Sequence, residues 1–443
     1  MPRDVPWPGG DVTLQAMRQL PAQAGYGPGD VLVMFGELFG RGYANGILAW
    51  ARRAGMTVVG ATVGRRDPDG ALRPLDAAEL AQAEANLGGR IVNVPLEAGF
   101  DLEPGGEGAA SPADQLKVAR PDAWASLALD WALVARSREA GARRFDRHLE
   151  RFVEALLPHV PAGANVLFVH TMAGGFPRAR VNMPLMTRMF RGRGEKYLAS
   201  EDFWKSDLGR LWEACFEEVT ARTFERLVAA TAPLRTGARR VRYVAYGYHG
   251  CEVLVGGRLT WQSYVPYLQG WAKRRLEAHA EAAWREGVRC TVFNAPEIWT
   301  QSSALFLGVE VSLYPLLEAV RRAGPGSPVA EGLWDRCRAR LAEGASLEAL
   351  LARADAYLGA EVMAPFRDPA RWPQHTTPAQ LTAMLDASDQ TLAMSRDPKD
   401  PICAELSRAV FDAVGRLMLD ASWEPAGPVA WLGHDVVAER IVR

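Results

Sequence analysis

Short runs of apolar and β-branched residues alternate with amphipathic stretches through the first part of the chain. Residues 30–36 form a buried-strand run that ends at a glycine, residues 44–54 carry apolar side chains at helical spacing, and residues 57–63 form a second β-branched run. Four later runs have the same strand-like character: residues 91–95, 165–170, 241–246 and 288–293. Because strands that alternate with helices form parallel sheets, this order predicts an α/β fold, a Rossmann-type doubly wound parallel sheet.

The chain, at 443 residues, is longer than such a core requires. We expect an N-terminal extension over residues 1–28, a Rossmann-type core over 29–323, and a helical C-terminal extension over 324–443. The extension is Ala-rich and carries no recognisable site. We expect it to pack on the core as a substrate-side cover or as a contact between subunits.

Three insertions enlarge the predicted core, at residues 97–142, 176–200 and 251–261. The first begins rich in Gly and Pro and leads into helical patterns near 123–135 and 143–157. The second is basic. The third has two strand-like flanks around Gly256 and Gly257, a pattern typical of a β-hairpin with a two-residue turn.

Charge and cysteine usage exclude several classes of protein. Lys and Arg number 51 against 52 Asp and Glu, which argues against a bulk nucleic-acid binder. The five cysteines are widely spaced without a C-x-x-C pair, and the seven histidines have no metal-binding spacing, so we expect no metal site and a reducing, cytoplasmic location. The most apolar later stretch, residues 302–320, contains Glu310, Pro315 and Glu318, so no membrane span is expected.

A glycine-rich connection follows the first predicted strand. Gly36, Gly40 and Gly42 have the spacing G-x-x-x-G-x-G and stand between a strand and a helix. Glycines let the backbone approach a pyrophosphate closely, and the N-terminus of the next helix faces the anion. The segment therefore predicts a dinucleotide-binding turn; the alternative is a connection that binds nothing.

The residues at the end of the second predicted strand indicate which dinucleotide binds, NAD or NADP. Folds that prefer NAD usually place an acid there, whereas an arginine accommodates the 2′-phosphate of NADP. The strand is followed by Arg65 and Arg66, with Asp67 next to them. The sequence thus predicts NADPH, with NADH possible, unless the two arginines are simply solvated.

These segments resemble the short-chain dehydrogenase/reductase superfamily, and within it the enoyl-acyl carrier protein reductases. The first strand–turn–helix of these enzymes resembles Gly36, Gly42-Tyr43-Ala44 and Gly46-Ile47 of this chain in residue type and spacing. Gly42 is a departure, because these enzymes usually have Ser at that position. The fourth strand ends in Val169-His170-Thr171-Met172-Ala173, like the Val-His-Ser of that group. The resemblance implies that Tyr43 and residues 170–173 contact the cofactor, with His170 a structural residue beside it.

The sixth strand and its loop, residues 287–300, resemble the family segment that holds the nicotinamide carboxamide and the phosphates. The resemblance implies cofactor contacts by Pro296, Ile298 and Thr300. It covers about residues 30–66 and 164–308, and not the last 120 residues (324–443).

Superfamily members pair a proton-donating Tyr with a Lys that binds the ribose and lowers the Tyr pKa. Lys273 matches that Lys, and Gln269 stands where ketone-reducing members have the Tyr. Tyr264 precedes Lys273 with eight residues between, matching the Y-x8-K spacing of one enoyl-reductase group. Because nine residues of continuous helix would put the two side chains on opposite faces, we expect the helix to begin near Pro266.

Other hydroxyls compete with that of Tyr264. Tyr267 is six positions before Lys273, and the end of the fifth strand offers Tyr246 and Tyr248, with Tyr248 the more favoured candidate for a second Tyr. The alternative without a catalytic role is that these tyrosine rings only pack against neighbouring side chains.

The resemblance therefore implies an enoyl-thioester reductase of fatty acid synthesis that uses NADPH, with acyl carrier protein or CoA thioesters as partners and a homo-oligomeric assembly. Two alternatives remain: a carbonyl or hydroxyl oxidoreductase of the same superfamily, and a non-catalytic NADP-sensing protein.

Overall fold

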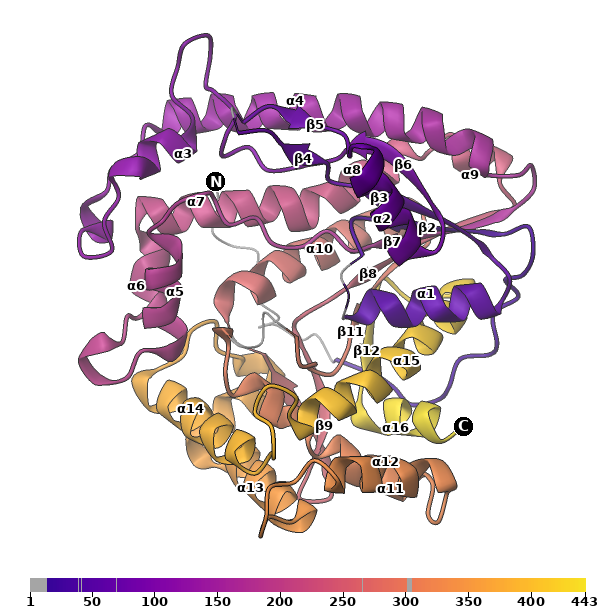
Figure 1. The fold of residues 1–443 in the computed structure, drawn as a ribbon, viewed down its shortest axis with the longest axis vertical. Coiled ribbons are helices and arrows are strands. Elements are labelled where there is room, and N and C mark those ends of the chain that lie inside the picture. The colour runs from indigo at the N-terminus through magenta and orange to yellow at the C-terminus, as the bar shows by residue number, and fades with distance from the viewer. Residues whose placement is uncertain (1–13, 39, 41, 69, 265, 301–304) are drawn as a thin grey trace.

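The computed structural model describes residues 14–443 except 39, 41, 69, 265 and 301–304 (Figure 1). Its centre is a sheet in which every neighbouring pair is parallel, in the order β1-β12-β11-β8-β7-β2-β3-β6. The strands are β1 (Ala16–Met17), β2 (Val31–Phe35), β3 (Thr57–Thr62), β6 (Arg90–Pro95), β7 (Asn165–His170), β8 (Arg240–Tyr246), β11 (Cys290–Asn294) and β12 (Val429–Leu432). The predicted Rossmann-type sheet is confirmed.

The chain reverses its direction of winding between β2 and β7. From β2 it proceeds outward to β3 and β6, and then crosses back to β7, β8, β11 and β12. In open α/β sheets the crevice beyond the carboxyl ends of the strands at such a switch point is where ligands bind. The glycine-rich connection follows β2, and the segment 170–173 follows from the end of β7, so both lie at this crevice.

Alternate residues of the central strand serve two cores. Leu32 and Met34 point into one apolar cluster, and Val31, Val33 and Phe35 point into the other. The first cluster is covered by α1 (Tyr43–Arg53) and α15 (Ile402–Trp423), and the second by α4 (Trp131–Leu156), α8 (Thr223–Ala230) and the later turns of α10 (Tyr267–Arg285). Both faces of the sheet are thus buried, as a parallel sheet requires.

Helix α15 belongs to the layer that covers the sheet. A Cβ added at Gly46 of α1 would lie 1.7 Å from the Phe411 carbonyl oxygen, and one at Gly415 would lie 2.1 Å from the Gly46 carbonyl carbon. Only glycines allow these two backbones to approach so closely. The pairing joins a helix of the predicted core to one of the predicted extension.

The boundary expected at residue 323 therefore needs correction. Strand β12 pairs with β11 in the same sheet, and β1, from the predicted N-terminal extension, pairs with β12. The sequence did not predict β12, because this strand has only four residues and follows about a hundred mainly helical residues.

The insertions are partly as expected. The hairpin is confirmed, with β9 (Gly250–Val255) and β10 (Arg258–Ser263) joined at Gly256 and Gly257. Of the two helical patterns expected near 123–135 and 143–157, the first is helical only from Trp131, after a 3-10 turn at Trp124–Ser126, and from there a single helix, α4, continues through Gly141 and the second pattern. A Cβ at Gly141 would lie 2.7 Å from the Cβ of Phe100, so this glycine serves a close contact.

The remaining elements complete the molecule. They are β4 (Arg65–Arg66), β5 (Leu72–Arg73), α2 (Ala77–Leu87), α3 (Pro112–Gln115), α5 (Asn182–Arg191), α6 (Ser200–Lys205), α7 (Asp207–Phe216), α9 (Leu234–Gly237), α11 (Leu316–Ala323), α12 (Pro328–Arg338), α13 (Leu347–Gly359), α14 (Pro378–Ala393) and α16 (His434–Val442). Figure 1 shows α11 to α14 gathered at the end of the molecule away from α4. Across the described residues, no helix combines the length and the apolar character needed to cross a membrane.

Candidate active site

The glycine-rich connection is a strand–turn–helix, as predicted. Gly36 has φ 124°, and a Cβ on it would lie 2.4 Å from Thr171 Oγ1, so the turn requires glycine there. The Thr171 amide donates to the Phe35 carbonyl at 2.9 Å, which ties the ends of β7 and β2 together. At Gly40 and Gly42 a Cβ would meet nothing within 4 Å, so this side of the turn is open.

Three cavities follow one another around this turn. The first, of about 240 Å³, lies against β3 and α2; we call it the β3 cavity, and its walls include Gly36, Glu37, Thr62, Arg65 and Gln82. The second, of about 150 Å³, is the Lys273 cavity; its walls include Tyr43, His170, Thr171, Ala173, Tyr246 and Lys273. The third, of about 200 Å³, is the α15 cavity, lined by Gly40, Gly42, Asn45, Trp299 and Arg408 among others. An elongated dinucleotide fits this series, since open space surrounds a helix N-terminus and the turn itself.

Lys273 is buried on the second turn of α10, and none of the described residues hydrogen-bonds its ammonium group. Burial lowers its pKa to about 8, and the Glu277 carboxylate one turn away partly opposes that shift. In the same cavity the buried hydroxyl of Tyr246 has no hydrogen-bond partner in the part of the chain that the structure describes. Two unsatisfied polar groups in one cavity are what a ribose or a substrate oxygen would satisfy.

His170 and its neighbours divide between cavity and core. The His170 Nε2 lies 2.9 Å from Thr223 Oγ1, and burial, together with the Lys273 charge, holds the pKa of His170 well below its usual value. His170 is therefore a neutral strand-end residue. Thr171 and Ala173 line the cavity, whereas the Met172 side chain packs in the apolar core.

Tyr264 lies just before α10, which begins at Tyr267 after Pro266 as expected. Its hydroxyl accepts a hydrogen bond from the Glu297 amide at 2.9 Å and lies 2.9 Å from Cys251 Sγ. The Tyr248 ring is 5.4 Å away. Neither tyrosine lines the Lys273 cavity, so the structure places this pair in a neighbouring cluster.

Tyr267, the rival six positions from Lys273, points elsewhere. Its hydroxyl donates to Glu213 Oε1 at 2.7 Å, and its ring stacks on His375 at 4.8 Å. This side chain is engaged with α7.

The loop after β11 connects the Lys273 cavity with the group of side chains around Tyr264. The Tyr43 hydroxyl, in the wall of the Lys273 cavity, donates to the Pro296 carbonyl, and the next residue, Glu297, bonds Tyr264. Ile298 is buried, Thr300 is half-buried, and between them the Trp299 amide donates to Ser407 Oγ of α15 at 2.7 Å. The segment predicted to hold the nicotinamide thus lies between the cavity and Tyr264.

Glu297 is a site residue that the sequence reasoning missed. Its carboxyl is buried and Tyr248 hydrogen-bonds it, whereas its Oε2 has no partner within the described residues. Burial, with a smaller contribution from the Glu310 charge, raises the pKa of Glu297 to about 7, although hydrogen bonds from Tyr248 and Ile298 oppose the shift. A Glu inside an otherwise apolar strand-end segment was the available signal.

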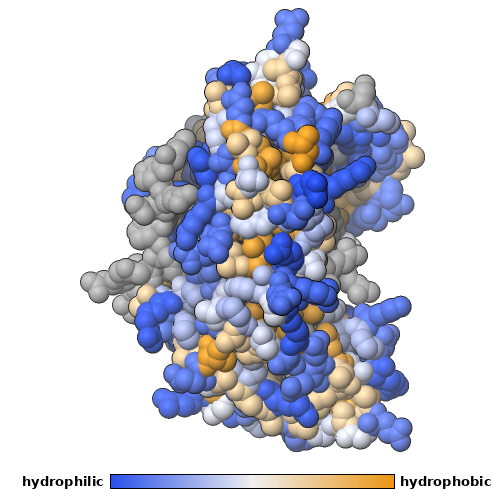
Figure 2. All heavy atoms as spheres, turned by 90° about the vertical axis from the view of Figure 1, so that its left-hand side faces the viewer, coloured by the Kyte–Doolittle hydropathy of each residue, from blue (hydrophilic) through white to orange (hydrophobic). Residues whose placement is uncertain are grey.

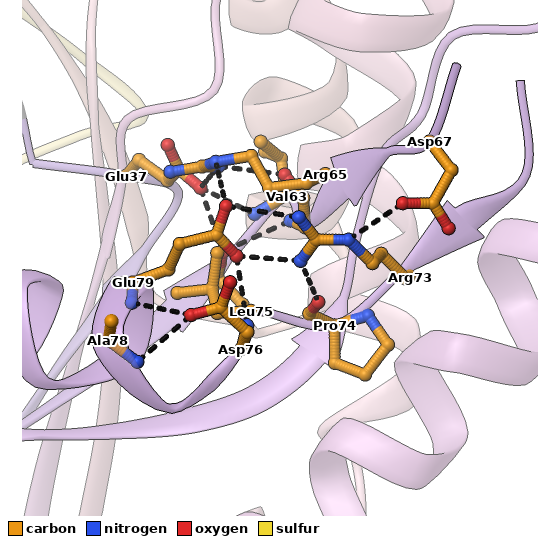
Figure 3. A network of polar contacts seen from close by, with 12 residues as sticks. Glu37, Val63, Arg65, Asp67, Arg73, Pro74, Leu75, Asp76, Ala78 and Glu79 are labelled. Atoms are coloured by element: carbon orange, nitrogen blue, oxygen red, sulfur yellow. Dashed lines mark hydrogen bonds and ion pairs between the residues drawn. The ribbon is translucent and has the colours of Figure 1, made fainter.

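Arg65 and Arg66 each pair with a carboxylate, as Figure 3 shows for Arg65, so the alternative in which both arginines are simply solvated is wrong. Arg65 Nη1 lies 2.8 Å from Glu37 Oε1. Arg66 lies 2.6 Å from Glu97 and 3.2 Å from Glu103, with its side chain only 14% exposed. Arg65 lines the β3 cavity, whereas Arg66 is bound to the first insertion.

Comparison with known proteins matches this architecture. The model of the FabMG enoyl-acyl carrier protein reductase family matches residues 13–441. The chain belongs to this family. An apo structure of FabMG, described as a novel type of enoyl-acyl carrier protein reductase, shares 46% identity with a TM-score of 0.92, over 96% of this chain and 97% of the other. An NADH-bound FabMG structure shares 39% identity with a TM-score of 0.77, over 96% and 98%.

The search of curated proteins gives no match. Membership in the family makes the chain an NAD(P)H-dependent oxidoreductase of the enoyl-acyl carrier protein reductase type, which confirms the resemblance inferred from the sequence. The family model extends almost to the C-terminus, consistent with the integration of β12 and α15 into the sheet.

Proposed function

We propose that this chain reduces the 2,3 double bond of an enoyl thioester, carried by acyl carrier protein or CoA, in fatty acid synthesis. The observation that carries the proposal is the Lys273 cavity, which opens beside the glycine turn and holds the Lys273 ammonium group and the Tyr246 hydroxyl, neither of them hydrogen-bonded by any residue that the structure describes. When bound, the nicotinamide supplies hydride to Cβ of the substrate.

Side chains of this protein then stabilise the negative charge that develops on the thioester oxygen. Tyr264 stabilises the enolate or donates its proton, with Tyr248 beside it, and Lys273 binds the ribose hydroxyls and favours the tyrosinate. Overall, one hydride and one proton are added across the double bond, and the proton is replaced from solvent. The burial of Tyr264 and Glu297, with Tyr248 half-buried beside them, supports this proposal because it keeps water away from the reacting oxygen.

The hydride donor is NADPH or NADH. NADPH was predicted from Arg65 and Arg66, and that remains a prediction; the pairing of both arginines with carboxylates favours NADH.

The partners remain proposals as well. In the basic insertion, Arg178 pairs with Glu97 and Asp101, and Arg193 pairs with Asp386 and Asp389. Figure 2 shows the side of the molecule on which α5 and α6 lie, where hydrophilic side chains predominate. An acidic carrier protein could dock there only through the arginines that are not already paired. Homo-oligomerisation and a cytoplasmic location stay sequence-based predictions.

The test is oxidation of NADH and of NADPH, followed at 340 nm, with crotonyl-CoA, an enoyl-acyl carrier protein and a 3-ketoacyl thioester. We expect turnover with the enoyl substrates. Faster reduction of the ketoacyl thioester would favour a carbonyl reductase, although Gln269 stands where that reaction needs its Tyr. Tight dinucleotide binding without turnover on any substrate would favour a sensor.

A further inference from the structure

Glu37 carries a carboxylate from the glycine turn across to the end of β3. It directly follows Gly36, and its Oε1 accepts hydrogen bonds from Thr62 Oγ1 at 2.7 Å, from the Val63 amide at 3.3 Å and from Arg65 Nη1 at 2.8 Å. Three donors from one strand end fix the side chain there. Among the described residues nothing hydrogen-bonds Oε2.

This position has a defined role in dinucleotide folds. An acid at the end of the second strand accepts a hydrogen bond from the ribose 2′-hydroxyl of NAD. In this chain β3 ends at Thr62, and Val63 and Gly64 follow it without an acid. The Glu37 carboxylate reaches the same place from the neighbouring turn, and it lines the β3 cavity of about 240 Å³.

The arginine that could bind a 2′-phosphate is already engaged. Arg65 donates to Glu37 and to the Gly64 carbonyl at 2.7 Å, and its Nε lies 4.0 Å from Glu79. Glu79 in turn binds Arg73, at 2.6 Å, as Figure 3 shows. Thus no cation at this cavity is without a carboxylate among the described residues, and a phosphate would arrive beside Glu37.

Arg66 offers no substitute. Besides its ion pairs with Glu97 and Glu103, it donates to the Gly70 carbonyl at 2.6 Å. Its guanidinium would have to leave all three partners to reach the β3 cavity.

We propose that Glu37 is the residue that selects the cofactor, and that it makes the site prefer NADH to NADPH. Oε2 accepts the ribose 2′-hydroxyl, while the same carboxylate repels a 2′-phosphate and holds Arg65 away from it. The inference rests on the proposed function only in taking a nicotinamide dinucleotide as the ligand. It departs from the prediction of NADPH, because that prediction counted Arg65 and Arg66 but not the carboxylates they face.

The test measures dissociation constants for NADH and NADPH by quenching of protein fluorescence, without any thioester present. We expect the wild-type protein to bind NADH at least about tenfold more tightly, since a hydrogen bond to a charged group contributes that much. In Glu37→Gln the ratio of NADH to NADPH affinity should shift by about tenfold or more toward NADPH, because the charge that repels the 2′-phosphate is removed and Arg65 is released. Glu201→Gln is the control: it removes one carboxylate from α6, outside the three cavities, and should shift the ratio of NADH to NADPH affinity by less than about twofold.

A second variant guards against misfolding of the first. Arg65→Ala should keep NADH affinity within about threefold, whereas a site built for the 2′-phosphate would lose NADPH affinity by tenfold or more. A wild-type preference for NADPH, or an unchanged ratio in Glu37→Gln, would overturn the inference, as would the absence of binding of both dinucleotides. NADH-selective binding without enoyl turnover would sink the proposed reaction and leave the role of Glu37 standing.

Discussion

The two sides of the crevice are built by opposite means. On the β3 side, oppositely charged side chains form ion pairs near the surface: the Arg65 side chain is 40% exposed and that of Glu37 is 24% exposed. On the Lys273 side, the polar groups are buried with few partners: no described residue hydrogen-bonds Glu297 Oε2 or the Tyr246 hydroxyl. The pKa values of Lys273 and Glu297 are correspondingly displaced, to about 8 and about 7.

The difference indicates a division of labour. Paired, partly exposed charges are well suited to discriminating between ligands, because an added or missing charge changes the balance without disturbing the fold. Buried and unsatisfied groups are unfavourable to folding, but they interact strongly with a charge that develops nearby. We therefore expect substitutions on the β3 side to change which cofactor binds, and those on the Lys273 side to change the rate or the pH dependence of stability.

The largest expected effect is on rate. Tyr264→Phe should lower kcat by about a thousandfold, the scale of a lost proton donor, while NADH and NADPH still bind. Steady-state kinetics with crotonyl-CoA, together with dinucleotide titration, would measure both. Tyr267→Phe is the matched control, because its hydroxyl bonds Glu213 and should leave the rate nearly unchanged.

The assignment of Tyr264 has a clear failing outcome. The Tyr246 hydroxyl lies in the same cavity as Lys273, whereas the Tyr264 hydroxyl is held by the Glu297 amide. If Tyr246→Phe lost the rate and Tyr264→Phe kept it, the proton donor would be Tyr246.

The same contrast separates what the sequence predicted from what it did not. The glycine turn, the parallel sheet of the core and the start of α10 after Pro266 were predicted because they depend on local spacing and on hydrophobic period. Glu37 and Glu297 were missed because their roles depend on which distant groups they meet: Thr62 and Arg65 for one, Tyr248 and Tyr264 for the other. Arg65 and Arg66 were identified, but their partners Glu37, Glu79 and Glu97 were not, because ion pairing is a property of the fold.

The next effect is on stability against pH, and it comes from Glu297. Burial raises its pKa from 4.5 to about 7, so the folded state binds the proton more tightly than the unfolded chain. The stabilisation from this carboxyl is complete below pH 4.5 and is lost as the pH rises through about 7, a difference of about 3 kcal/mol. Glu297→Gln should therefore be about as stable as wild type at pH 5, and more stable at pH 8.

Urea unfolding at both pH values would measure this difference. Glu201→Gln is the control, since Lys205 lowers the pKa of that exposed carboxyl and no gain at pH 8 is expected. An equal gain at pH 5 and pH 8 would mean that the carboxyl is not titrating in the folded state.

The smallest effect, on the β3 side, concerns Arg66. Because Glu97, Glu103 and the Gly70 carbonyl hold its guanidinium, Arg66→Ala should change the ratio of NADH to NADPH affinities by no more than about twofold. The substitution should instead lower the free energy of unfolding in urea by about 1–3 kcal/mol, because Glu97 and Glu103 each lose one partner and keep only Arg178 and Arg144 among the described residues. Glu201→Gln, which leaves Arg66 untouched, provides the comparison for both measurements. A large loss of NADPH affinity in Arg66→Ala would show that its guanidinium turns toward the ligand when a dinucleotide binds, and the pairing seen in this structure would then describe only the unliganded state of the β3 side.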